Sequence, residues 1–121
     1  MNRRYRLRRT QDFARLRQEG RTARHPLLSV SAAPNALPHN RYGFITGRRL
    51  GKAVVRSRAR RRMQEAVRLL HPRLEQGYDV VFIGRPAVIE AAYAAVAQAV
   101  EQTLRRVALF VEDDEETNKH A

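Results

Sequence analysis

The densest chemical pattern in this sequence is cationic rather than catalytic. Residues 48–62 read RRLGKAVVRSRARRR, with eight cations in fifteen positions. Over residues 48–68 nine cations face only Glu65, a net charge of +8. Guanidinium groups bind phosphates in a bidentate manner, and a polyanionic partner offsets the repulsion among so many like charges. We therefore predict that this segment binds a nucleic acid backbone, whether RNA or DNA.

The rest of the charge is also unevenly distributed along the chain. The 121 residues carry 24 Lys and Arg against 12 Asp and Glu, a net charge of +12. Residues 1–24 hold nine arginines, whereas residues 112–121 have a net charge of −4. The length suits one domain. We predict a single RNA-binding domain over residues 1–111 and an acidic, disordered tail over residues 112–121.

Residues suited to protein-based catalysis are sparse. The absence of Cys excludes disulfides, thiol catalysis and cysteine-ligated zinc. The four His are scattered without metal-ligand spacing, and no glycine-rich loop matches a phosphate-cradling motif. We predict no catalytic residue and no metal ligand in the protein. A metal-free nuclease that uses two histidines and a lysine is the weaker alternative. No apolar run spans a membrane and no secretory signal is evident, so we expect a cytoplasmic protein.

The elements that must carry the basic segment follow from periodicity and turn residues. Helices are predicted over residues 10–19, 53–70 and 87–110, and strands over residues 27–33, 41–47 and 78–84. The order α-β-β-α-β-α predicts an α+β fold, a small two-layer sandwich with a central mixed sheet. We expect the first two strands to pair antiparallel. The second and third strands form a βαβ crossover if they pair in parallel.

The central helix is predicted to be amphipathic, with cations outside its buried stripe. Apolar residues recur at steps of three and four: Val55, Ala59, Met63, Ala66 and Leu70. Arginines border this stripe on both sides. The helix can therefore pack on a sheet and still present a broad guanidinium surface to solvent.

The stretch Arg48–Arg68 resembles the signature of the bacterial ribonuclease P protein subunit, in which a basic pair, Gly-x-Ala-Val and Arg-Asn-Arg follow a strand and begin a helix. Three further segments are similar to that family, and only the acidic tail falls outside the likeness: Asp12-Phe13 with Gly20, Arg41–Phe44, and Gly77–Pro86.

This resemblance implies a protein cofactor of a ribozyme that removes the 5′ leader from precursor tRNA, in tRNA 5′ maturation. The RNA subunit would perform the Mg²⁺-dependent endonucleolytic hydrolysis, with Mg²⁺ held mainly by that RNA. The implied partners are the catalytic RNA and precursor tRNA, without a membrane or an obligatory protein partner. The family also implies a left-handed βαβ crossover, against the usual preference.

Site residues carried over from the family fall into two sets. Those expected to contact the catalytic RNA are Arg48, Arg49, Lys52, Arg56, Ser57, Arg58, Arg60, Arg61 and Arg62. Those expected at a leader cleft between the sheet and the first helix are Phe13, Arg17 and Ser31. For Phe13, an ordinary core position is the alternative.

Three residues depart from the family pattern. Ser57 replaces the usual Asn, which predicts a weakened RNA contact, because a hydroxyl offers fewer hydrogen bonds than an amide. Arg17 and Ser31 stand where aromatic residues are common, so leader stacking would depend more on Phe13 and on guanidinium planes. A generic basic nucleic-acid-binding protein, such as a ribosome-associated or DNA-binding module, is the alternative function.

Overall fold

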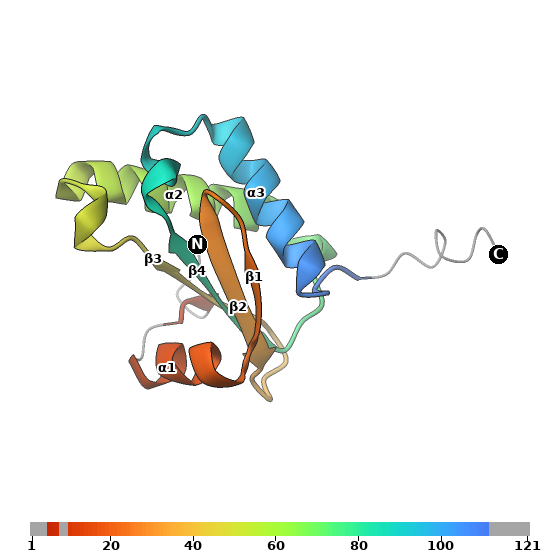
Figure 1. The fold of residues 1–121 in the computed structure, drawn as a ribbon. Coiled ribbons are helices and arrows are strands. Elements are labelled where there is room, and N and C mark those ends of the chain that lie inside the picture. The colour runs from red at the N-terminus through yellow and green to blue at the C-terminus, as the bar shows by residue number, and fades with distance from the viewer. Residues whose placement is uncertain (1–4, 8–9, 112–121) are drawn as a thin grey trace.

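The protein is described here by a computed structural model, which covers residues 5–7 and 10–111 (Figure 1). Its elements follow the order α-β-β-β-α-β-α, with a short 3-10 helix in each of the last three connections. Their bounds are α1 Thr10–Glu19, β1 Arg21–Arg24, β2 Leu28–Pro34, β3 Arg41–Ile45, α2 Ala53–Leu70, β4 Tyr78–Gly84 and α3 Tyr93–Arg106. The predicted α+β class is confirmed. The predicted acidic tail, residues 112–121, lies outside the described residues.

The four strands form one mixed sheet in the order β1-β2-β4-β3. β3 and β4 pair in parallel, and α2 connects them along the chain, so they form the predicted βαβ unit. The predicted pairing of the first two strands is wrong, because β4 lies between β2 and β3 and pairs antiparallel with β2. β4 is an almost continuous apolar run, and a central position lets both of its faces be covered.

The additional strand β1 lies at the edge of the sheet and was not predicted. Its sequence, Arg-Thr-Ala-Arg, buries only Ala23. Four residues with one buried side chain produce no apolar alternation, since an edge strand leaves most of its surface in solvent. Backbone pairing with β2 in register, from Arg21 opposite Ala32 to Arg24 opposite Ser29, is what defines the strand.

The last helix begins later than predicted. Residues 86–90 form a 3-10 turn, and the extended backbone of Ala91 and Ala92 separates it from α3. Val88 is fully buried and packs against Gly84, where an added Cβ would lie 3.2 Å from its Cγ1 atom. The turn thus inserts a core residue at the end of β4 and sets the point from which α3 starts.

The helices cover the two faces of the sheet unequally (Figure 1). α2 and α3 pack on one face over the main core, which includes Met63, Phe82 and Leu104. α1 lies on the opposite face over a small cluster formed by Leu7, Leu16, Ala33 and Val81. The predicted buried stripe of α2 is confirmed at its centre by Ala59, Met63 and Ala66. α1 covers only one end of its face, so part of the sheet stays open.

Candidate nucleic-acid interface

The first candidate surface begins where β3 leads into α2. The 3-10 helix η2, Arg48–Leu50, follows β3, and α2 starts at Ala53. Gly51 joins them with φ 134° and ψ −160°, a backbone conformation found almost only in glycine. This turn leaves three of the predicted cations exposed just before the helix: Arg48, Arg49 and Lys52.

Hydroxyl groups orient one guanidinium on the β3 side of α2. Arg60 donates from one terminal nitrogen to Oγ1 of Thr46 (2.6 Å) and from the other to Oγ of Ser57 (2.9 Å). Ser57 therefore has a role within the protein, because its hydroxyl fixes the Arg60 side chain. Both acceptors are neutral hydroxyls, so these hydrogen bonds do not compensate the guanidinium charge.

The other arginines of α2 lie at different depths. Arg58 and Arg61 are exposed, whereas Arg56 and Arg62 are half-buried. Arg62 donates to the carbonyl oxygen of Ala91 (2.8 Å) and so ties α2 to the start of α3. We call the eight cations of this region the basic surface: Arg48, Arg49, Lys52, Arg56, Arg58, Arg60, Arg61 and Arg62.

No cation of the basic surface forms an ion pair with a carboxylate of the described residues. Two other exposed arginines on the helices do: Arg68 with Glu65 (2.6 Å) and Arg105 with Glu101 (3.0 Å). The hydrogen bond from Arg68 lowers the pKa of Glu65. Acidic neighbours thus neutralise the flanking arginines, while the basic surface keeps its full charge for an external anion.

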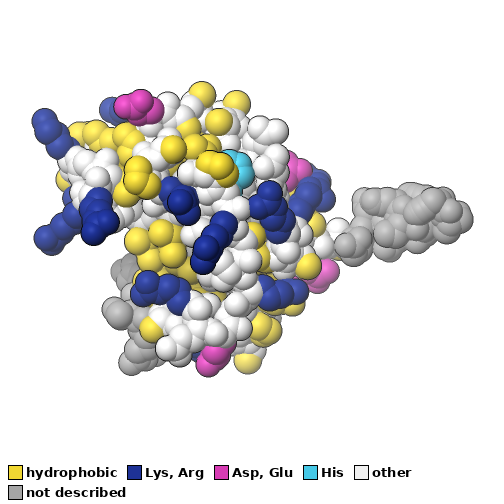
Figure 2. All heavy atoms as spheres, viewed as in Figure 1, with side chains coloured by type: hydrophobic (Ala, Val, Ile, Leu, Met, Phe, Trp, Pro, Cys, Tyr) yellow, Lys and Arg dark blue, Asp and Glu magenta, His cyan; other side chains and the backbone are white. Residues whose placement is uncertain are grey.

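The second candidate surface is the part of the sheet beside α1, which we call the open sheet face. Residues paired across the four strands form rows on this face. The two rows next to α1 are Thr22-Ser31-Val81-Gly43 and Arg24-Ser29-Ile83-Ile45. Figure 2 shows apolar side chains in the middle of this side of the molecule, with Lys and Arg side chains around them. The surface combines apolar contact area with a cationic border.

The predicted leader residues lie on or beside the open sheet face. Phe13 is half-buried in the small cluster under α1, so it is partly a core residue. Its ring lies over Gly43, where an added Cβ would be 2.5 Å from Cε1 of Phe13. Ser31 is buried and its hydroxyl shares a hydrogen bond with Thr22 (3.0 Å). Arg17 is exposed and, at ~100° per helical residue, lies on the flank of α1 opposite Arg15.

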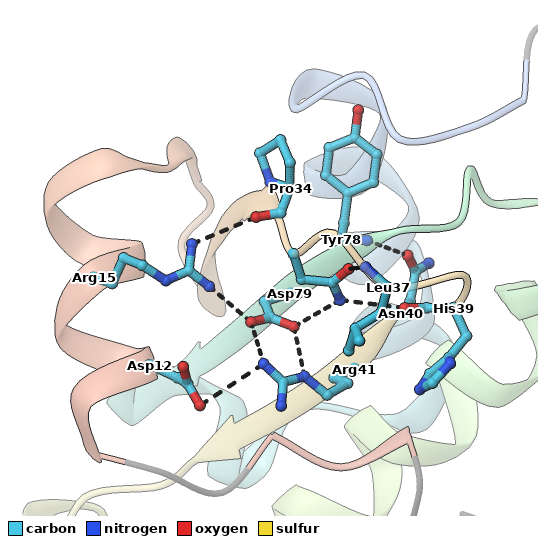
Figure 3. Close-up of polar contacts among 10 residues, drawn as sticks. Asp12, Arg15, Pro34, Leu37, His39, Asn40, Arg41, Tyr78 and Asp79 are labelled. Atoms are coloured by element: carbon cyan, nitrogen blue, oxygen red, sulfur yellow. Dashed lines mark hydrogen bonds and ion pairs between the residues drawn. The ribbon is translucent and has the colours of Figure 1, made fainter.

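A buried carboxylate, Asp79, ties α1 to the sheet (Figure 3). Its side chain is fully buried and accepts from Arg15 (2.8 Å), from Nε and a terminal nitrogen of Arg41 (2.9 and 2.8 Å), and from Asn35 (2.9 Å). The hydrogen bonding of Arg41 to the Asp79 carboxylate also raises the pKa of Arg41. Because Arg15 belongs to α1 and Arg41 to β3, the carboxylate fixes the helix that borders the open sheet face.

Sequence reasoning did not single out Asp79, although a signal was present. It is the only residue with a charged side chain in the apolar strand Tyr78–Gly84. A charged residue that must be buried with such a strand requires a partner of opposite charge. That requirement predicts a buried ion pair without saying which arginine supplies it.

A second group of hydrogen-bonded side chains lies at the start of β3. Asn40 donates from Nδ2 to the hydroxyl oxygen of Tyr42 (3.0 Å), which leaves the hydroxyl proton for the bond to Nδ1 of His71 (2.7 Å). Burial raises the pKa of Tyr42 to about 12. Burial, followed by repulsion from His39, lowers the pKa of His71. These hydrogen bonds join the start of β3 to the residue that follows α2, and the lowered pKa of His71 favours the neutral imidazole that can accept from Tyr42.

Candidate metal ligands do not cluster in the described part of the chain. No group of three or more His, Asp or Glu side chains there is placed to hold a metal ion. Asp79, the buried carboxylate, has its oxygens occupied by donors from two arginines and Asn35. The described His, Asp and Glu side chains therefore do not provide a set of ligands that fits Mg²⁺. Among residues 5–7 and 10–111, no helix has the length and apolar character needed to cross a bilayer.

The fold and the two surfaces define a small α+β protein in which the basic surface, without carboxylate partners among the described residues, lies beside a sheet that α1 covers only in part. Solved structures with the same fold are found among ribonuclease P proteins. The ribonuclease P protein of Staphylococcus aureus superposes with a TM-score of 0.82 at 22% identity, covering 88% of this chain and 98% of that one. The ribonuclease P protein of Thermotoga maritima gives 0.77 at 28% identity, covering 84% and 98%.

Sequence comparison identifies the family. The family model described as Ribonuclease P matches residues 1–108. A ribonuclease P protein component of Chloroflexus aurantiacus is 48% identical, covering 97% of this chain and 87% of that protein. One from a Roseiflexus species is 45% identical, covering 94% of each. The chain belongs to the bacterial ribonuclease P protein family. It is thus the protein component of the ribonuclease P holoenzyme, and the resemblance seen in the sequence is confirmed.

Proposed function

We propose that the basic surface is the side of the protein that binds the ribonuclease P RNA. The observation that carries this proposal is that its eight cations have no carboxylate partner among the described residues. Phosphates that they neutralise release counterions, so binding weakens steeply as salt rises. Arg60, already oriented by Thr46 and Ser57, loses less side-chain entropy on binding than a free arginine does.

The open sheet face is the binding site for the single-stranded 5′ leader in this proposal. Its apolar side chains provide surface for bases, and Arg17 and Arg24 provide cations at its border. Phe13 contributes the part of its ring that the small cluster leaves uncovered. Ser31 supports the floor of the site through its bond to Thr22 and does not itself stack on bases.

The protein acts by binding and orienting RNA, and the catalytic RNA carries out the hydrolysis. Mg²⁺ held by that RNA supplies the chemistry of phosphodiester cleavage. The residues of the protein neutralise phosphates on one side and hold the leader on the other, so that precursor tRNA is bound in preference to mature tRNA. We expect this maturation of the tRNA 5′ end to occur in the cytoplasm, without a membrane or an obligatory protein partner.

Reconstitution tests the proposal. The full chain is mixed with its catalytic RNA and a precursor tRNA at physiological salt, and release of the leader is followed over time. We expect no cleavage by the protein alone and faster cleavage by the mixture than by the RNA alone. An unchanged rate would leave a generic basic RNA-binding or DNA-binding protein as the better interpretation. Cleavage by the protein without RNA would indicate a protein nuclease.

A further inference from the structure

A groove lies between α2 and α3, on the side of the sheet away from α1. This groove of about 380 Å³ is lined on the α2 side by Ala66, Leu69 and Leu70, and on the α3 side by residues from Tyr93 to Glu101. Its volume falls in the lower range of ligand-binding pockets. Leu69 and Tyr93 are 56% and 36% exposed, although both are large apolar side chains. An apolar groove that opens to solvent in this way has the character of a binding site.

Small residues create the groove. Ala94 and Ala97 lie on the α3 side, where larger side chains would fill the space between the helices. Tyr93 is the first residue of α3, because the extended backbone of Ala92 delays the helix to this point. Tyr93 lines the groove and is partly exposed, so its ring is accessible to a ligand.

The charges around the groove favour an anionic partner. Another hollow on α2 is lined by Arg61, Gln64, Glu65 and Arg68; Arg61 belongs to the basic surface, and Leu69 of the groove follows Arg68 in the helix. Glu65 is paired with Arg68. Glu101, the acid that lines the groove, is paired with Arg105. The carboxylates here are thus neutralised, while Arg61 has no described carboxylate partner.

We propose that an unpaired nucleobase of the ribonuclease P RNA enters the α2–α3 groove and stacks on Tyr93. This inference rests on the proposed RNA contact of the basic surface, from which the groove continues along α2. Aromatic rings and apolar walls bind extruded bases, and flanking guanidinium groups hold the phosphates on either side. The leader is assigned to the opposite face of the sheet, so the base comes from the catalytic RNA. A second copy of this chain fits less well, because each copy carries a net charge of +12.

The salt dependence of RNA binding distinguishes stacking from phosphate contact. Tyr93→Leu keeps an apolar side chain and removes the ring, whereas Tyr93→Phe keeps the ring. We expect Tyr93→Leu to weaken binding of the full chain to its catalytic RNA by about 5- to 100-fold at every salt concentration, with an unchanged slope of log K against log salt. Tyr93→Phe should bind within about twofold of the parent, because stacking depends on the ring.

Filling the groove is an independent test. Ala94 is exposed, so Ala94→Phe can block the groove without removing any contact of the core. We expect a loss of RNA affinity similar to that of Tyr93→Leu. Leu37→Ala is the matched control, since Leu37 is 38% exposed and lies in the loop between β2 and β3. It should leave the affinity unchanged, and circular dichroism checks that every variant is folded.

A third pair of substitutions separates failure of this inference from failure of the proposed function. Arg58→Ala with Arg61→Ala should reduce the salt slope by about 0.7–0.9 per lost phosphate contact. If that slope falls while Tyr93→Leu and Ala94→Phe bind as the parent does, the groove proposal is wrong and the basic surface stands. If the slope does not change either, the proposed RNA surface is wrong as well. Should Tyr93→Leu alter only self-association in sedimentation equilibrium, the groove is a protein interface and the proposal is overturned.

Discussion

Replacing Asp79 by Asn should destabilise the fold and loosen α1 more than any comparable change on the sheet. The carboxylate accepts four hydrogen bonds, three of them from the guanidinium groups of Arg15 and Arg41. An amide of the same shape has one acceptor oxygen and no charge. At least one guanidinium would then face an NH₂ group and lose its partner.

The expected loss follows from the exposure of the partners. Removing one member of a buried ion pair costs ~3–5 kcal/mol. Here the Asp79 side chain is 0% exposed, but those of Arg15 and Arg41 are 32% and 27% exposed and can regain water. We therefore expect a loss of about 2–3 kcal/mol in the free energy of unfolding. With a typical urea m value of ~1–3 kcal/mol/M, the midpoint of unfolding should fall by about 0.7–3 M.

Asp12→Asn is the matched control for urea unfolding. Asp12 belongs to the same cluster, but its carboxylate is partly exposed and lies 3.8 Å from Arg41, so the expected loss is below about 0.5 kcal/mol. Asp79→Asn should also reduce the preference for precursor over mature tRNA, since α1 borders the open sheet face. The reasoning is refuted if both variants unfold at the same urea concentration.

Three further outcomes are expected. Arg56→Ala combined with Arg60→Ala should weaken RNA binding and reduce its salt slope by roughly two phosphate contacts, measured by fluorescence titration at several salt concentrations. Gly43→Ala should lower the thermal midpoint and the affinity for precursor tRNA, because its Cβ would lie 2.5 Å from the ring packed over it. The pKa of His71 is lowered in the folded state, so the unfolded chain binds more protons near its ordinary value of 6.5. Stability should therefore fall as pH drops below about 6.5, and this part of the pH dependence of the urea midpoint should vanish in His71→Phe.

Each of these outcomes has a contrary result that would count against it. An unchanged salt slope would show that Arg56 and Arg60 do not reach phosphates. A parental thermal midpoint for Gly43→Ala would show that α1 shifts freely over the sheet. If His71→Phe keeps the whole pH dependence between pH 5 and 8, the bond from Tyr42 to His71 does not govern it.

Much of the local structure was predictable from the residues. The stripe at Ala59, Met63 and Ala66 predicted how α2 packs, and the cations between those positions predicted its outer surface. The apolar run 78–84 predicted a strand covered on both faces. These features depend on periodicity within one segment, which the sequence contains in full.

Apart from the late start of α3, the errors concern relations between segments. The position of β4 between β2 and β3 satisfies backbone hydrogen bonds and burial for the whole sheet, and no single strand specifies it. β1 exists because β2 offers an edge for pairing, not because its own residues favour a strand.

The sequence by itself determined the family, the cationic helix and the absence of cysteine chemistry, because these depend on residue type and spacing. Only the tertiary structure decided that Asp79 holds α1 and that Ser57 orients Arg60. It also decided that alanines leave a groove beside Tyr93. Contacts between side chains distant in sequence depend on how the layers pack, and a buried charge or a hollow is defined only once its neighbours are in place.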